Sequence, residues 1–151
     1  MTRDRYSLLL FLLFVIGGGL AIGFLTLPGE WYAALAKPPF NPPSWVFAPV
    51  WSVLYVMIAV AGWSVFRRDR LGRAMKLWCL QLLLNFLWSP IFFGAHWIGA
   101  ALLIVVLMLA VILGFIAVAW RQHRPAAWLF VPYAAWVAFA AGLNGALLAL
   151  N

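Results

Sequence analysis

Apolar residues run along the chain in five long stretches, separated by short polar or proline-containing segments. A helix needs roughly 20 consecutive apolar residues to cross the hydrocarbon core of a bilayer, and each stretch is close to that length. The pattern therefore predicts an all-α integral membrane protein, in which residues 1–151 form a single five-helix domain. The expected spans are about 7–27, 45–66, 74–93, 97–120 and 126–150, with a Pro/Trp-rich loop at 28–44.

Composition agrees with this pattern. The chain has 151 residues, of which 68% are hydrophobic and only 9% charged, and the mean hydropathy is +1.05. A soluble domain is about half apolar and about a quarter charged, so this chain lacks the polar residues to cover a surface in water. The continuous apolar runs exclude an outer-membrane barrel, whose strands alternate apolar and polar residues. A single cysteine, Cys79, excludes an intrachain disulfide and a zinc knuckle.

The basic residues predict how the chain is oriented. With five spans, Lys37 is the one basic residue on the side opposite the N-terminus. The nine basic residues on the side of the N-terminus are Arg3, Arg5, Arg67, Arg68, Arg70, Arg73, Lys76, Arg121 and Arg124. The positive-inside rule then predicts a cytoplasmic N-terminus and an outer C-terminus, in a bacterial cell membrane. An alternative is that Arg67–Lys76 forms a lipid-headgroup or nucleic-acid patch. We expect the bilayer, and no nucleic acid, as a partner.

The loop at 28–44 combines five prolines with several aromatic side chains and almost no charge. Proline fixes φ and removes a hydrogen-bond donor, so neither a regular helix nor a flexible linker is expected. We interpret the loop as a lid across the outer end of the bundle. An interfacial aromatic belt is the alternative. The lid residues are Trp31, Lys37, Pro38, Pro42, Pro43 and Trp45.

Polar and aromatic residues recur at helical spacing in three spans, and each set therefore shares one helix face. Such residues tend to face the interior of a bundle or a ligand. Their depths predict that the faces meet beneath the loop, around a pocket for a large, flat, mostly apolar ligand. The alternative is packing and hydrogen bonding between helices. The sets are Trp51 and Tyr55; Trp78, Gln81, Asn85 and Trp88; and Tyr133, Trp136, Ala140, Leu143 and Asn144.

Small residues and prolines also recur within the spans. Gly19-x-x-x-Gly23 and a stripe of Ala134, Ala138, Gly142 and Ala146 are typical of close helix contacts. Pro49, Pro90 and Pro132 predict local kinks or helix ends.

Residues for conventional catalysis are scarce. All three carboxylates (Asp4, Glu30 and Asp69) lie in loops or tails, so acid–base chemistry inside the bundle is not expected. His96 and His123 fall at opposite sides of the membrane and cannot share a metal ion. We therefore expect no conventional enzyme, no metal site and no obligatory cofactor.

Three segments carry a specific resemblance. They are 31–51 (WYAALAKPPFNPPSWVFAPVW), 81–94 (QLLLNFLWSPIFFG) and 132–144 (PYAAWVAFAAGLN). The chain resembles a bacterial-type member of the tryptophan-rich sensory protein/translocator protein family (TspO/MBR, peripheral benzodiazepine receptor). The resemblance extends over essentially the whole chain and implies a five-helix bundle, often a homodimer.

The resemblance also implies ligands and a site. Family members bind porphyrins, haem and, in mitochondria, cholesterol and benzodiazepine- or isoquinoline-type ligands, and bacterial members are linked to tetrapyrrole homeostasis and stress responses. Residues 143–151 lack the aromatic–basic pair of the mitochondrial cholesterol motif, which argues against strong sterol recognition there. The family's two tryptophans implicated in light-dependent porphyrin breakdown match Trp51 and Trp136. Its pocket residues match Tyr32, Trp51, Tyr55, Asn85, Trp88, Trp136, Ala140 and Leu143.

These observations favour a membrane receptor or sensor that binds a porphyrin or haem beneath the loop, with Gln81 and Asn144 completing the site. One alternative is a transporter of porphyrins or other amphipathic molecules, although the chain shows no inverted repeat and no coupling carboxylate. Another is a light- and oxygen-dependent enzyme, in which Trp51 or Trp136 donates an electron to an excited porphyrin.

Overall fold

The computed structural model describes residues 2–151, with side chains from Asp4 onward, and every regular element in this part of the chain is helical. Five segments are long and apolar enough to cross a membrane: Asp4–Leu25, Ser44–Arg68, Arg73–Gly94, Ile98–Gln122 and Arg124–Leu150. The prediction of an all-α membrane protein with five spans is confirmed.

The spans and the loop between the first two consist of several helical elements. In chain order these are α1 (Thr2–Leu25), α2 (Glu30–Ala34), a 3-10 turn (Ser44–Val46), α3 (Phe47–Arg68), α4 (Arg73–Ser89), a π-helical turn (Pro90–Gly94), α5 (Ile98–Gln122) and α6 (Arg124–Leu150). The loop at 28–44 differs from the expectation, because α2 is a short regular helix within it. Prolines flank this stretch at Pro28 and Pro38 but are absent between them, so one helical turn can form there.

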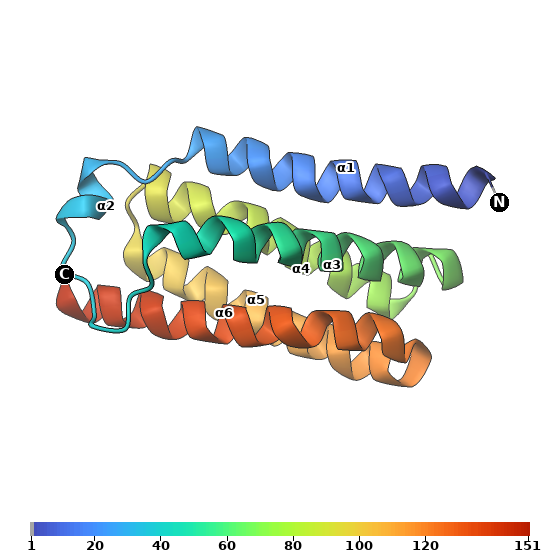
Figure 1. Cartoon of the computed structure of the whole chain (residues 1–151). Helices are drawn as coiled ribbons and strands as arrows, with labels where there is room; N and C mark the ends of the chain where they lie inside the picture. The colour runs from blue at the N-terminus through green and yellow to red at the C-terminus, as the bar shows by residue number, and fades with distance from the viewer. Residues whose placement is uncertain (1) are drawn as a thin grey trace.

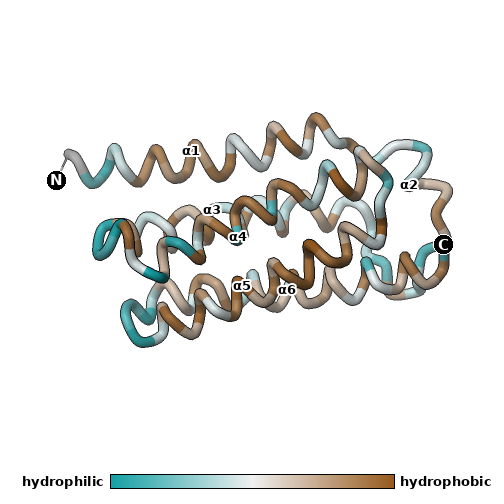
Figure 2. Tube along the Cα trace, turned by 180° about the vertical axis from the view of Figure 1, so that it is seen from behind, coloured by the Kyte–Doolittle hydropathy of each residue, from teal (hydrophilic) through white to brown (hydrophobic). Residues whose placement is uncertain are grey.

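The long helices pack side by side around the bundle in the order α1, α3, α6, α5 and α4, and α4 contacts α1 to complete the ring. The N-terminus lies at one end, while α2 and the C-terminus lie together at the other (Figure 1). The hydrophilic α3–α4 and α5–α6 connections lie at the end of the N-terminus, and apolar residues dominate the helices between the two ends (Figure 2). We call these the basic end and the loop end.

The core lies among α3, α4, α5 and α6, where Ile58, Ile112, Phe115, Phe130 and Val137 are fully buried. Helix α1 is peripheral, because only Val15 and Gly19 are buried along its described length. Burial of α1 thus depends on a narrow strip that faces α3 and α4.

Glycines allow close contacts between helices of the bundle. A Cβ atom at Gly19 would collide with the ring of Tyr55, and one at Gly62 would collide with the indole of Trp78. In contrast, Gly23 has no neighbouring atom within 4 Å of such a Cβ. The Gly19-x-x-x-Gly23 spacing therefore does not act as one contact surface within the chain. Along the α6 stripe, Ala138 and Gly142 are exposed.

Candidate functional site

Four polar side chains form a hydrogen-bonded network near the middle of the bundle. The Nδ2 atom of Asn85 donates to the hydroxyl of Tyr133 at 2.8 Å, and that hydroxyl donates to Oε1 of Gln81 at 2.9 Å. The hydroxyl of Tyr55 donates to Oδ1 of Asn85 at 3.3 Å. The network therefore joins α3, α4 and α6, and Tyr133 is its central member. Met108 of α5 lies against it, with its Sδ atom 3.5 Å from the Tyr133 hydroxyl.

One donor of this network has no partner. Gln81 is fully buried, and its Nε2 atom makes no hydrogen bond to any residue that the structure describes. Most buried polar side-chain atoms in native proteins are hydrogen-bonded, because burial without a partner costs free energy. The Nε2 atom is thus a fixed donor inside the bundle that a ligand's acceptor atom could satisfy.

A second polar contact lies closer to the loop end. The indole Nε1 of Trp88 donates to Oδ1 of Asn144 at 3.2 Å, and Nδ2 of Asn144 donates to the carbonyl of Ile98 at 3.0 Å. Asn144 therefore links α4, α5 and α6, and both of its polar atoms are satisfied.

Two half-buried indoles border the polar network. Trp51 lies 5.4 Å from the ring of Tyr55 and 6.3 Å from that of Tyr133, measured between centroids. Trp136 instead packs against Phe47, at 5.9 Å, and Phe139, at 5.5 Å. The two tryptophans thus meet different neighbours, although both lie where α3 faces α6. Ala140 is half-buried, one turn after Trp136, and Leu143 is buried further along α6.

Phe92 is the centre of an aromatic cluster that the sequence pattern did not identify. It is buried, stacks on Trp88 at 5.0 Å and meets Phe93 edge-on at 4.8 Å. Trp31 and Tyr32 of α2 pack edge-on against it at 5.7 and 6.1 Å. The sequence signal for Phe92 was its position four residues after Trp88, which would place both side chains on one helix face. Pro90 lies between them and was expected to kink or end the helix. Helix α4 does end at Ser89, directly before Pro90, and the π-helical turn that follows contains Phe92.

The loop packs onto the loop end of the bundle through a few specific contacts. The Nζ atom of Lys37 donates to the carbonyls of Tyr32, Ala33 and Leu35, which closes the C-terminus of α2. The side-chain amide of Asn151 exchanges hydrogen bonds with the backbone of Ala36 at 2.9 and 3.0 Å. These bonds tie α2 and the segment after it to the end of α6.

The other residues expected in the lid differ in position. Trp31 stacks on His96 at 4.1 Å, and Pro38 is buried. Pro42 is half-buried and Pro43 exposed, while Trp45 is 73% exposed and does not cover the bundle. Burial raises the pKa of the Tyr32 hydroxyl above its ordinary value, and the neighbouring Asn41 partly opposes this shift.

The sequence-predicted faces therefore converge, but their side chains occupy the space between the helices. The two best-formed surface hollows both lie at the basic end, with volumes of about 460 and 250 Å³. Neither is lined by a residue of the polar network. Among residues 2–151, the structure brings together no group of three His, Cys, Asp or Glu side chains that could hold a metal ion.

Fold and site define a class: a five-helix membrane protein with an aromatic and amide-rich centre and an aromatic loop at one end. Comparison with known proteins then gives the family. Residues 10–150 match the model of the TspO/MBR family, and the chain belongs to this family.

Relatives resemble the chain over most of its length. It is 36% identical to the "Tryptophan-rich sensory protein" of Cereibacter sphaeroides, over 100% of this chain and 95% of that protein. It is 39% identical to the "Tryptophan-rich protein TspO" of Chlorobaculum tepidum, over 90% and 92% of the two chains. The "Translocator protein" of Ovis aries is 40% identical, over 85% of this chain and 79% of that protein. Membership in this family supports a role as a membrane sensor or translocator.

Proposed function

We propose that this protein is a membrane receptor or sensor that binds a porphyrin or haem-type tetrapyrrole within the helix bundle. The proposal is carried by two half-buried indoles that lie beside a buried network of amide and hydroxyl groups. One donor of this network, Nε2 of Gln81, has no partner among the described residues. The faces of Trp51 and Trp136 suit stacking on a flat apolar ring. The amide of Gln81 suits a polar atom of the same ligand.

Binding would require space that side chains now fill. Helix α1 is the element that could supply it, because it closes over Tyr55 and Phe86 through Gly18 and Gly19 and most of its described residues are exposed or only half-buried. An outward shift of α1 would expose the Tyr55 ring, at the cost of the apolar contacts that Phe11 makes with Phe66 and Trp78. The aromatic contacts of α2 with Phe92 would close the loop end above the ligand.

A tryptophan-fluorescence titration of the purified protein with protoporphyrin, haem and a sterol, side by side, tests the proposal. We expect saturable quenching by the tetrapyrroles and weaker or no quenching by the sterol. The Ala140→Leu variant should bind protoporphyrin on the order of tenfold more weakly, since overpacking a filled site costs about 1–3 kcal/mol.

Ala138→Leu is the matched control, because Ala138 lies on the exposed side of the same helix. It should bind like the wild type. Unchanged affinity in a folded Ala140→Leu variant would show that the ligand does not reach Trp136. Uphill or vectorial uptake of porphyrin into protein-containing liposomes would favour the transporter instead.

We further propose that the basic end is cytoplasmic in a bacterial cell membrane, because nine of the ten basic residues lie in the helix ends and the α3–α4 connection on that side. A topology reporter fused after Asn151 should then be active outside the membrane, and one inserted within Arg67–Arg73 should be active in the cytoplasm. The opposite pattern would place the loop end on the cytoplasmic side.

A further inference from the structure

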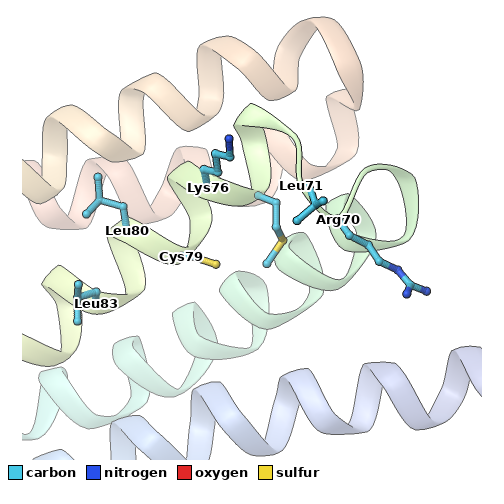
Figure 3. A pocket seen from close by; sticks show the side chains of 7 residues that line it. Arg70, Leu71, Lys76, Cys79, Leu80 and Leu83 are labelled. Atoms are coloured by element: carbon cyan, nitrogen blue, oxygen red, sulfur yellow. The ribbon is translucent and has the colours of Figure 1, made fainter.

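The larger surface hollow lies on the outside of α4 at the basic end, away from the polar network. It has a volume of about 460 Å³, and its walls come from the α3–α4 loop and from α4. The loop contributes Arg70 and Leu71, and α4 contributes Lys76, Cys79, Leu80 and Leu83 (Figure 3). The hollow thus combines two cations with a mainly apolar wall.

No carboxylate of the described residues pairs with either cation. Asp4 forms an ion pair with Arg67 at 2.8 Å. Asp69 accepts a hydrogen bond from the backbone N–H of Leu71 at 3.3 Å, and Glu30 lies in α2 at the other end of the bundle. The guanidinium of Arg70 lies over the ring of Phe66, 4.8 Å from its centroid, and forms no ion pair with the described residues.

The apolar wall continues from Lys76 toward the middle of the membrane. Leu80 and Leu83 follow Lys76 at i+4 and i+7, so the three side chains share one face of α4 over about 10 Å. The two leucines are 43% and 62% exposed, and this face is therefore directed at lipid. A cationic end followed by an exposed apolar track complements a negatively charged headgroup followed by an acyl chain.

The neighbouring hollow lacks this combination. It is smaller, about 250 Å³, and is lined by Asp69 as well as by Arg68 and His123. Arg68 also donates to the carbonyl of Gln122 at 3.4 Å, so its guanidinium is already engaged. An anion at this place would face a carboxylate that lines the hollow, whereas no carboxylate lines the larger hollow on α4.

We propose that the hollow on α4 binds one anionic phospholipid, with its headgroup attracted by the two cations of the hollow, Arg70 and Lys76, and an acyl chain along Leu80 and Leu83. The lipid would belong to the leaflet at the basic end, whichever side of the membrane that is. The site is independent of the tetrapyrrole site proposed above.

Native mass spectrometry of the detergent-purified protein tests this site, with phosphatidylglycerol and phosphatidylcholine of identical acyl chains as probes. We expect one phosphatidylglycerol to remain bound at concentrations where phosphatidylcholine does not. Each basic residue near an anionic lipid surface contributes about fivefold in affinity, so Arg70→Gln/Lys76→Gln should weaken phosphatidylglycerol binding on the order of twentyfold.

The matched control is Arg121→Gln/Arg124→Gln, which removes the same charge from the same end of the bundle outside the hollow. It should retain the bound lipid. Equal losses in the two double variants would overturn the proposal, because binding would then reflect the general positive charge of this end.

A second pair of measurements separates a lipid from a free phosphate. Leu80→Ala/Leu83→Ala should weaken phosphatidylglycerol binding while leaving both cations in place, and soluble glycerol phosphate should not displace the lipid. If glycerol phosphate competes fully and the leucine variant binds normally, the hollow recognises only a phosphate group and the lipid proposal is wrong.

Discussion

Replacing Tyr133 with phenylalanine is expected to lower the free energy of unfolding by about 2 kcal/mol, although only one oxygen atom is removed. That hydroxyl accepts a hydrogen bond from Asn85 and donates one to Gln81. Single interhelical hydrogen bonds in membrane proteins average only about 0.6 kcal/mol, because the unfolded chain in the membrane also finds partners. Here two bonds are lost, which leaves Nδ2 of Asn85 and Oε1 of Gln81 buried without these partners, while Oδ1 of Asn85 keeps its bond from Tyr55.

Tyr55→Phe is the matched variant. The Tyr55 hydroxyl makes one longer bond of 3.3 Å and is only partly buried, so its loss should cost less than about 1 kcal/mol. Both variants can be unfolded reversibly by increasing the fraction of a denaturing detergent in mixed micelles, with helix content as the readout. Equal costs at the two positions would contradict a network centred on Tyr133.

Helical periodicity was sufficient to predict which polar residues share a face. Gln81 and Asn85 lie four apart and Tyr133 lies on the matching side of α6, so all three point into the bundle. Periodicity within one helix says nothing about the vertical offset between two helices. The offset between α4 and α6 places the Tyr133 hydroxyl between the amides of Gln81 and Asn85. In this arrangement Nε2 of Gln81 has no partner among the described residues.

Other features depend on backbone details that residue patterns do not specify. The π-helical turn after Ser89 continues α4 past Pro90 and brings Phe92 beneath α2. The direction of Trp136, toward Phe47 and Phe139, depends on how the start of α3 packs on α6. Gly23 fits a small-residue spacing, but no atom of the neighbouring helices lies within 4 Å of a Cβ atom placed there.

The second large effect is expected at the two indoles that border the network. Trp51→Phe/Trp136→Phe should retain most of the affinity for protoporphyrin, because an aromatic ring remains at each position. Phenylalanine is a much poorer electron donor than indole. If these tryptophans reduce an excited porphyrin, light-driven loss of porphyrin should fall at least about tenfold, the change that a barrier about 1.4 kcal/mol higher produces.

The measurement pairs a binding isotherm in the dark with a bleaching rate under illumination at equal occupancy, for each single variant and the double variant. Trp97→Phe/Trp128→Phe is the control, since both side chains are mostly exposed, at 65% and 59%. It should leave binding and bleaching unchanged. Trp→Ala at position 51 or 136 should reduce both quantities, because it also leaves a cavity against the ligand.

The structure gives Trp51 the stronger case as the electron donor. Its indole is followed by Tyr55 and Tyr133 at centroid distances of 5.4 and 6.3 Å, two further oxidisable rings linked to the buried network. Trp136 is surrounded by Phe47 and Phe139, which cannot replace a lost electron as readily. We therefore expect Trp51→Phe alone to slow bleaching more than Trp136→Phe alone. Wild-type bleaching in the double variant would show that both indoles only form walls of the site, and the photochemical function would be excluded while the binding function remained.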